Sequence, residues 1–177
     1  MKHIKYWMVS AFCFATISTL KAQETYWSRV EKRESTLGIA DIYQKFNTPE
    51  FRLKLVRASQ TVAALNPNSE PYFDFTPGER LEIRDKDSLY HLGDINLRIK
   101  DANGIWKNYS TATSRAAVKP LEVSGNILAG ADLANTLPGD IPVSVKRYYE
   151  LDNEQLVMRF EITNKQNVPL EIGALGV

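Results

Sequence analysis

The chain has 177 residues, 44% of them hydrophobic and 24% charged, with 9 Gly, 8 Pro and a formal net charge of +1. This composition is typical of a globular domain and excludes a collagen, a coiled coil or a disordered tail. One Cys and two His exclude iron–sulfur clusters, cysteine-type zinc sites and multi-histidine metal centres. We therefore expect no cofactor and no metal centre.

Residues 1–22 predict a secretory signal peptide. Two lysines precede the apolar residues 6–20, and Ala22 places a small residue at a cleavage point before Gln23. A transmembrane helix needs about 20 apolar residues, so we expect no membrane span once the leader is removed. Removal would take the only Cys and three Lys and would lower the net charge from +1 to −2. We expect a secreted or periplasmic protein that does not bind nucleic acid, because no basic excess remains.

After the leader, we divide the chain into a lead-in segment, residues 23–35, and a β-sandwich domain, residues 36–177. A short helix is predicted within the lead-in, over residues 24–34. The domain alternates apolar and polar residues with a period of two, which is typical of half-buried antiparallel strands. The alternating stretches are 51–55, 81–84, 95–99, 141–151 and 156–162. Many short strands separated by Pro, Gly and Asn predict an all-β fold, an antiparallel β-sandwich.

Turn residues predict how some of these strands pair. Asn103-Gly104 predicts a tight hairpin, because both residues tolerate a positive φ. Short polar turns predict that 141–151, 156–162 and 169–172 form a three-stranded meander. The apolar end of the chain suggests a domain cut inside a larger protein, although a buried final strand would give the same pattern.

A charged stretch around His91 is the best local cluster for acid–base chemistry or ion binding. Asp85 and Asp87 precede this histidine by six and four positions. A solvated loop between two strands has the same composition, and a lone histidine is usually structural. We therefore predict no catalytic residue in this chain.

Aromatic side chains offer a second kind of site. Trp106 and Tyr109 follow the predicted hairpin, and flat rings near a loop can stack on sugar faces, so both are candidate carbohydrate-binding residues. Large rings also dominate hydrophobic cores. We expect Phe73, Phe75 and Trp106 to lie in the core and Tyr109 to be the most exposed of the four.

Several segments resemble an uncharacterised family of secreted bacterial and fungal proteins. These segments are FRLKLVRASQT (51–61), DIPVSVKRYYE (140–150), LVMRFEITN (156–164) and VPLEIGALG (168–176). Members of the family join an N-terminal β-supersandwich to an (α/α) six-hairpin, glycosidase-like barrel. The likeness spans residues 36–177, and it implies that this chain is the sandwich part, with a catalytic barrel downstream in the same polypeptide.

The resemblance implies a sandwich that supports and flanks the barrel of a secreted glycoside-hydrolase-like protein and is not catalytic alone. A self-sufficient sandwich that binds a glycan through Trp106 and Tyr109, or a structural module without a sugar role, remains an alternative. A mutarotase-like epimerase using His91 and a carboxylate is a further alternative. Turnover by this chain alone would favour an enzyme, and glycan binding without turnover would favour the binding module.

Overall fold

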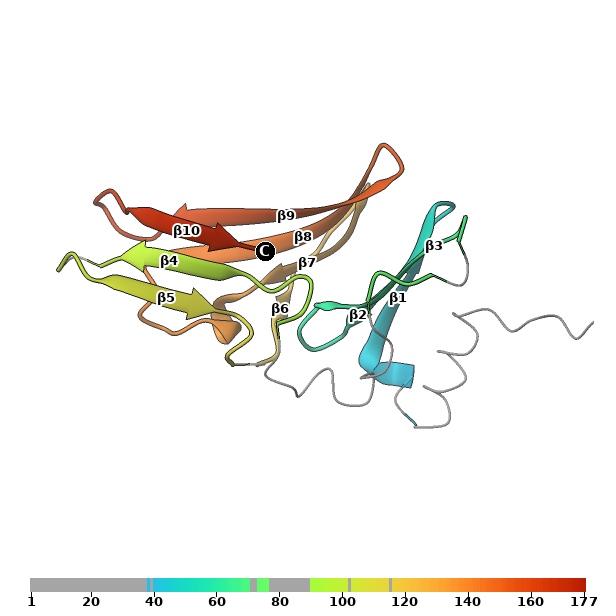
Figure 1. Cartoon of the computed structure of the whole chain (residues 1–177), viewed down its shortest axis with the longest axis horizontal. Coiled ribbons are helices and arrows are strands. Elements are labelled where there is room, and N and C mark those ends of the chain that lie inside the picture. The colour runs from blue at the N-terminus through green and yellow to red at the C-terminus, as the bar shows by residue number, and fades with distance from the viewer. Residues whose placement is uncertain (1–37, 39, 71–72, 77–89, 102, 115) are drawn as a thin grey trace, which may run out of the picture.

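A computed structural model describes residue 38 and residues 40–70, 73–76, 90–101, 103–114 and 116–177. The predicted leader, the lead-in helix and the strand at 81–84 lie outside these residues. The regular secondary structure of the described part consists almost entirely of antiparallel strands, which form three sheets (Figure 1). The prediction of an all-β antiparallel sandwich is confirmed.

Each sheet is named here by its strands. The N-terminal sheet has the order β1-β2-β3, the short sheet β10-β4-β5 and the long sheet β6-β7-β8-β9. The strands are β1 (Tyr43–Asn47), β2 (Phe51–Val56), β3 (Val62–Pro67), β4 (Asn96–Lys100), β5 (Trp106–Ser110), β6 (Lys119–Pro120), β7 (Ile127–Asp132), β8 (Val143–Asp152), β9 (Gln155–Asn164) and β10 (Ile172–Gly176). Two 3-10 turns, η1 (Ala40–Ile42) and η3 (Ala134–Thr136), complete the described elements.

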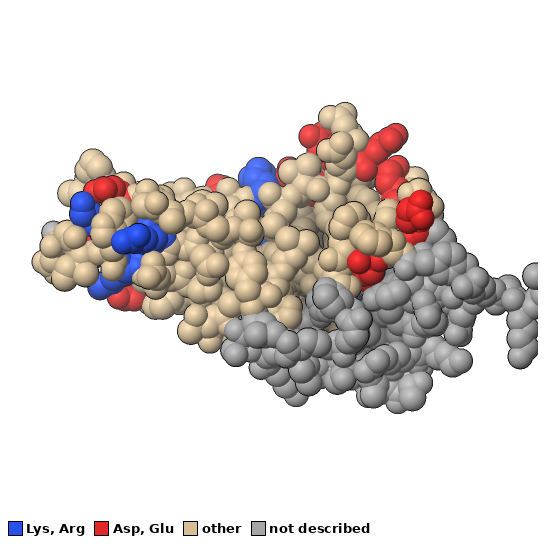
Figure 2. Space-filling model, viewed as in Figure 1, with Lys and Arg blue, Asp and Glu red and all other residues tan. Residues whose placement is uncertain are grey.

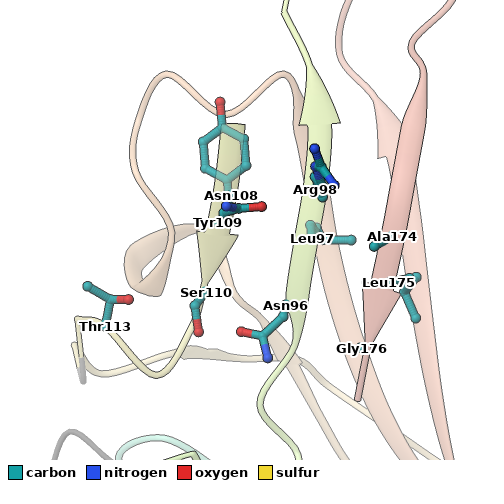
Figure 3. Close-up of a pocket in the computed structure, with 10 residues that line it drawn as sticks. All are labelled: Asn96, Leu97, Arg98, Asn108, Tyr109, Ser110, Thr113, Ala174, Leu175 and Gly176. Atoms are coloured by element: carbon teal, nitrogen blue, oxygen red, sulfur yellow. The ribbon is translucent and has the colours of Figure 1, made fainter. Parts of the chain in front are cut away.

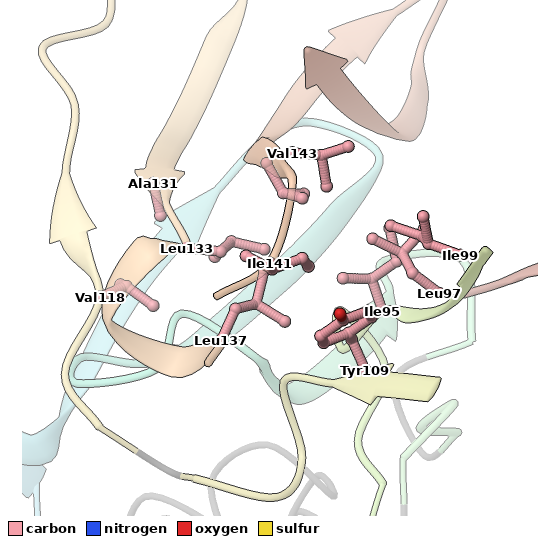
Figure 4. Close-up of a cluster of buried hydrophobic side chains, with 11 residues drawn as sticks. Ile95, Leu97, Ile99, Tyr109, Val118, Ala131, Leu133, Leu137, Ile141 and Val143 are labelled. Carbon is pink, nitrogen blue, oxygen red and sulfur yellow. The ribbon is translucent and has the colours of Figure 1, made fainter. Parts of the chain in front are cut away.

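Both other sheets pack against one face of the long sheet. Along β8, alternate side chains are buried, and this row forms the inner face of the sheet. Val143 and Val145 belong to the core cluster shared with β4 and β5, in which Figure 4 labels Val143. Tyr149 belongs to a second cluster, shared with β2. The inner face of β8 thus carries two adjacent cores, one under the short sheet and one under the N-terminal sheet.

The predicted hairpin joins β4 to β5. Gly104 has a φ of +79°, and Asp101 Oδ1 accepts hydrogen bonds from the backbone N–H groups of Asn103 and Ile105, each at 2.9 Å. The bond from Ile105 is the main cause that lowers the pKa of the Asp101 carboxyl below its usual value. The hairpin register pairs Lys100 with Trp106 and Arg98 with Asn108.

The predicted meander is wrong in its third strand. β8 and β9 pair along their full lengths, as expected, but β10 pairs with β4 in the short sheet. Pro169 has no N–H to donate to a ladder on β9, and Leu170 turns into the core shared by the two sheets. The chain therefore crosses from the long sheet to the short sheet before β10 begins.

One side of the sandwich leaves inward-facing side chains exposed. Ile172 and Leu175 are aligned with the buried Ile99 and Leu97 on β4, yet they remain 45% and 51% exposed. Both β10 and β9 lie at the ends of their sheets and run along this side (Figure 1). On β9, the inner-facing row is only partly buried and comprises Leu156, Met158, Phe160 and Ile162. We call this region, from β9 to β10, the open side.

Candidate functional site

The two candidate carbohydrate-binding residues lie on opposite faces of β5. Tyr109 is 7% exposed and belongs to the core cluster between the short and long sheets. Trp106 is half-buried and lies on the outer face of the short sheet, because three positions separate it from Tyr109 on a strand. The two rings therefore cannot form one stacking surface. The expectation that Tyr109 is exposed is wrong, and so is the expectation that Trp106 lies in the core.

The expected core positions of the other aromatic residues also need correction. Phe73 and Phe75 are 51% and 61% exposed and contact each other edge to face, with ring centroids 4.9 Å apart. Between them, Asp74 Oδ1 accepts hydrogen bonds from the backbone N–H groups of Leu65 and Thr76. Alternation along this extended segment turns Asp74 towards β3 and both rings away from it.

Trp106 is held flat against the short sheet by its neighbours. Arg98 Cζ and Lys100 Nζ lie 5.0 and 5.3 Å from the centroid of the indole. A Cβ at Gly173 would lie 2.7 Å from Cη2 and Cζ3 of the ring, so only glycine leaves room for the indole there. This arrangement fixes both the ring and the two cations beside it.

A cavity of about 490 Å³ is lined by residues of β5, β4 and β10. Outward-facing residues of β4 and β5 form its floor in cross-strand pairs, Asn96 with Ser110 and Arg98 with Asn108 (Figure 3). Thr113 and Gly176 lie at its margins. This surface, which we call the Arg98 face, combines the charge of Arg98 with amide and hydroxyl groups.

His91 lies in a buried polar turn. It is 9% exposed, and its backbone N–H donates to Asp94 Oδ2 at 2.8 Å, while the Thr111 hydroxyl donates to Asp94 Oδ1 at 2.8 Å. Asp85 and Asp87, predicted to act with His91, lie outside the described residues. Among the described residues, the carboxylate that meets the histidine turn is that of Asp94, and its hydrogen bonds hold the start of β4 to the end of β5.

Two side chains of β8 connect this turn to the N-terminal sheet. Arg147, 1% exposed, donates from Nη1 to the carbonyl of Gly93 and from Nη2 to the carbonyl of Ser59 at 2.7 Å. The Tyr149 hydroxyl donates to the carbonyl of Gln60 at 2.7 Å. We call this cluster the junction, because it joins all three sheets at the boundary between the two cores.

Burial also changes the acidity of the tyrosines. Loss of hydration raises the pKa of Tyr149 to about 12, although the nearby Arg147 charge acts in the opposite direction. Burial likewise raises the pKa of Tyr109, with a smaller contribution from the Asp140 carboxylate. Both phenols are therefore neutral hydrogen-bonding groups at neutral pH.

In the ranges that the structure describes, no three side chains of His, Cys, Asp or Glu are grouped so that they could hold a metal ion. Within the same ranges, no helix has the length and apolar character that a membrane crossing would require.

Comparison with known proteins places the chain in a family. The model of a family of unknown function, DUF5695, matches residues 54–177, which is more than half of the sequence. The chain belongs to the DUF5695 family. The match begins in β2 and includes the junction, the Arg98 face and the open side. No curated protein and no solved structure matches this DUF5695 chain.

Proposed function

We propose that this chain is the non-catalytic β-sandwich of a secreted glycoside-hydrolase-like protein, and that it supports and flanks a catalytic barrel of the same polypeptide. The signal-like residues 1–22 support export. The resemblance of residues 36–177 to sandwiches that precede a six-hairpin barrel supports the glycosidase part. Membership of DUF5695 adds a family and leaves its activity open.

The open side is the observation that carries the supporting role. Inward-facing side chains of a complete sandwich are normally buried, yet Leu175 and Ile172 are about half exposed. The outer edges of β9 and β10 also have backbone N–H and C=O groups that face away from their own sheets. An additional segment of the polypeptide that lies along these edges would pair the backbone groups and cover the apolar side chains together.

The energetic gain from such a contact is substantial. Complete burial of a Leu or Ile side chain is worth about 1.5–3 kcal/mol, and half of that gain is still available at each of these two positions. The half-buried row on β9, which includes Phe160 and Ile162, would be covered by the same segment. The sandwich and its neighbour would then share one hydrophobic core, which is the relationship expected of a supporting domain.

An activity comparison tests this function. Residues 23–177 and the polypeptide that the complete gene encodes would both be incubated with a panel of plant and bacterial polysaccharides, and release of reducing sugar would be measured. We expect release only by the complete gene product. Turnover by residues 23–177 alone would overturn the non-catalytic role, and an inert complete product would overturn the glycosidase part.

A pair of variants tests the supporting contact. Leu175→Asp puts a charge on the open side, whereas Val168→Asp puts the same charge on the exposed turn before β10. In the complete gene product, we expect Leu175→Asp to lower the melting temperature by several degrees, because burial of an unpaired charge is costly. Val168→Asp should have little effect. Equal, small effects of both variants would contradict the proposal.

A further inference from the structure

The Arg98 face differs from the open side in its chemistry. Of the described residues that line its cavity, none is acidic, and Arg98 contributes a positive charge. Figure 2 shows Lys and Arg side chains at the end of the molecule that carries the β4–β5 hairpin, with acidic side chains beside them. The surface is therefore electrostatically suited to a negatively charged ligand.

Arg98 is the cation on this face that is oriented for binding. Its neighbour Lys100 is paired with Glu171 at 3.0 Å, so its charge is already partly neutralised. Within the described part of the chain, the guanidinium of Arg98 has no hydrogen-bond acceptor and is held by stacking on Trp106. Stacking leaves the planar N–H groups free, and two parallel N–H groups match the two oxygens of a carboxylate.

The remaining polar groups of the face suit hydroxyl groups rather than a second charge. The side-chain amides of Asn96 and Asn108 form no hydrogen bond with any described residue, so each amide presents both donors and an acceptor. The Ser110 oxygen accepts from the Ala112 backbone N–H at 3.2 Å, and its O–H remains available to donate. A ligand that satisfies these groups needs several hydroxyls within a few ångströms of its carboxylate.

We propose that the Arg98 face binds an acidic oligosaccharide, with a uronate carboxylate on Arg98 and neighbouring sugar hydroxyls on Asn96, Asn108 and Ser110. Trp106 fixes the guanidinium, because the Arg98 Cζ lies 5.0 Å from the centroid of the indole. A cavity of about 490 Å³ has room for one or two sugar rings. The polar contacts of the binding site come from β4 and β5 and use no residue of the junction, although Leu175 of the open side also lines the cavity.

Binding to four probes tests the proposal. Isothermal titration would use tetragalacturonate, its methyl ester, neutral cellotetraose and tetraglutamate, a peptide with comparable charge. The ester keeps the hydroxyls and removes the charge, whereas the peptide keeps the charge and removes the hydroxyls. We expect tetragalacturonate to bind at least about tenfold more tightly than each of the other three, because only it satisfies both groups of contacts.

Two variants identify the residue responsible. Arg98→Gln removes the charge of an exposed side chain and should weaken tetragalacturonate binding about tenfold or more, without affecting the fold. Lys119→Gln is the matched control, because it removes one exposed positive charge on β6 in the long sheet. The proposal would be overturned if tetragalacturonate bound no more tightly than its ester or than the peptide, or if none of the probes bound. Equal effects of the two variants would also overturn it.

Discussion

Substitution of Gly93 tests how the three sheets are joined. Its φ of +105° is unfavourable for any residue with a Cβ, and a Cβ there would lie well inside van der Waals contact with the Tyr149 hydroxyl. The same atom would lie 3.2 Å from Arg147 Nη1. Neither group can move without losing its hydrogen bond to the β2–β3 turn, at Gln60 or Ser59.

These contacts give the expected loss of folding free energy for Gly93→Ala. The positive φ costs about 1–2 kcal/mol in an L-residue, and insertion of a methyl group into a filled site costs about 1–3 kcal/mol more. Gly104→Ala is the matched control, since Gly104 also has a positive φ but has nothing within 4 Å of an added Cβ. We expect a loss of about 2–5 kcal/mol for Gly93→Ala and about 1–2 kcal/mol for Gly104→Ala.

Urea unfolding followed by circular dichroism measures both losses. A double-mutant cycle with Tyr149→Phe then isolates the contact, because removal of the hydroxyl relieves the overlap with the new methyl group. Alone, Tyr149→Phe leaves the Gln60 carbonyl unpaired and should cost about 1–3 kcal/mol, and this cost should shrink in the Gly93→Ala background. Equal losses for Gly93→Ala and Gly104→Ala would refute the close approach at the junction.

Two further predictions concern the cores and the pH dependence. In residues 23–177, Leu97→Ala should cost about 2–5 kcal/mol, whereas Leu175→Ala should cost less than half as much because Leu175 is half exposed; urea unfolding distinguishes the two. The folded-state pKa of about 12 for Tyr149 lies above the usual value near 10, so its contribution to stability is fully present below pH 10 and is lost as the pH rises through 12. Between pH 9 and 12, the free energy of unfolding should therefore decline more steeply for the unmodified chain than for Tyr149→Phe. Parallel declines of the two free energies would contradict burial of this phenol.

Several strands could be predicted because their side chains alternate between a solvent-exposed face and a buried face. Residues 51–55, 95–99 and 156–162 lie within or overlap β2, β4 and β9. β3 and β7 were not predicted, since both carry consecutive buried residues, as in Val62-Ala63-Ala64, and show no period of two. A strand that is covered on both faces lacks the alternating signal.

Arg147 shows why the junction could not be predicted. It stands at an inner position of the alternating row on β8, where its charge would ordinarily indicate a solvent-facing side chain. Its hydrogen bonds go to the carbonyl groups of Ser59 and Gly93, which are 88 and 54 residues away in sequence. Only the packing of all three sheets brings these acceptors together.

The Arg98 face was partly predictable. The Asn103-Gly104 turn fixes the register of the hairpin, and that register places Arg98 opposite Asn108 and Lys100 opposite Trp106. Counting alternate positions along β5 would also have placed Trp106 and Tyr109 on opposite faces. The approach of Gly173 to the indole was not predictable, because it depends on the crossing of β10 into the short sheet.

The rate of thiol labelling at position 175 tests most directly whether another segment covers the open side. The only Cys of residues 1–177 lies in the predicted leader, so Leu175→Cys supplies the one thiol of residues 23–177, and peptide mapping reads its labelling in the complete gene product. Ser124→Cys, in an exposed turn, provides the reference rate. In the polypeptide that the complete gene encodes, we predict labelling of Leu175→Cys at least about tenfold slower than of Ser124→Cys. Equal rates would contradict the account, because the open side would then face solvent.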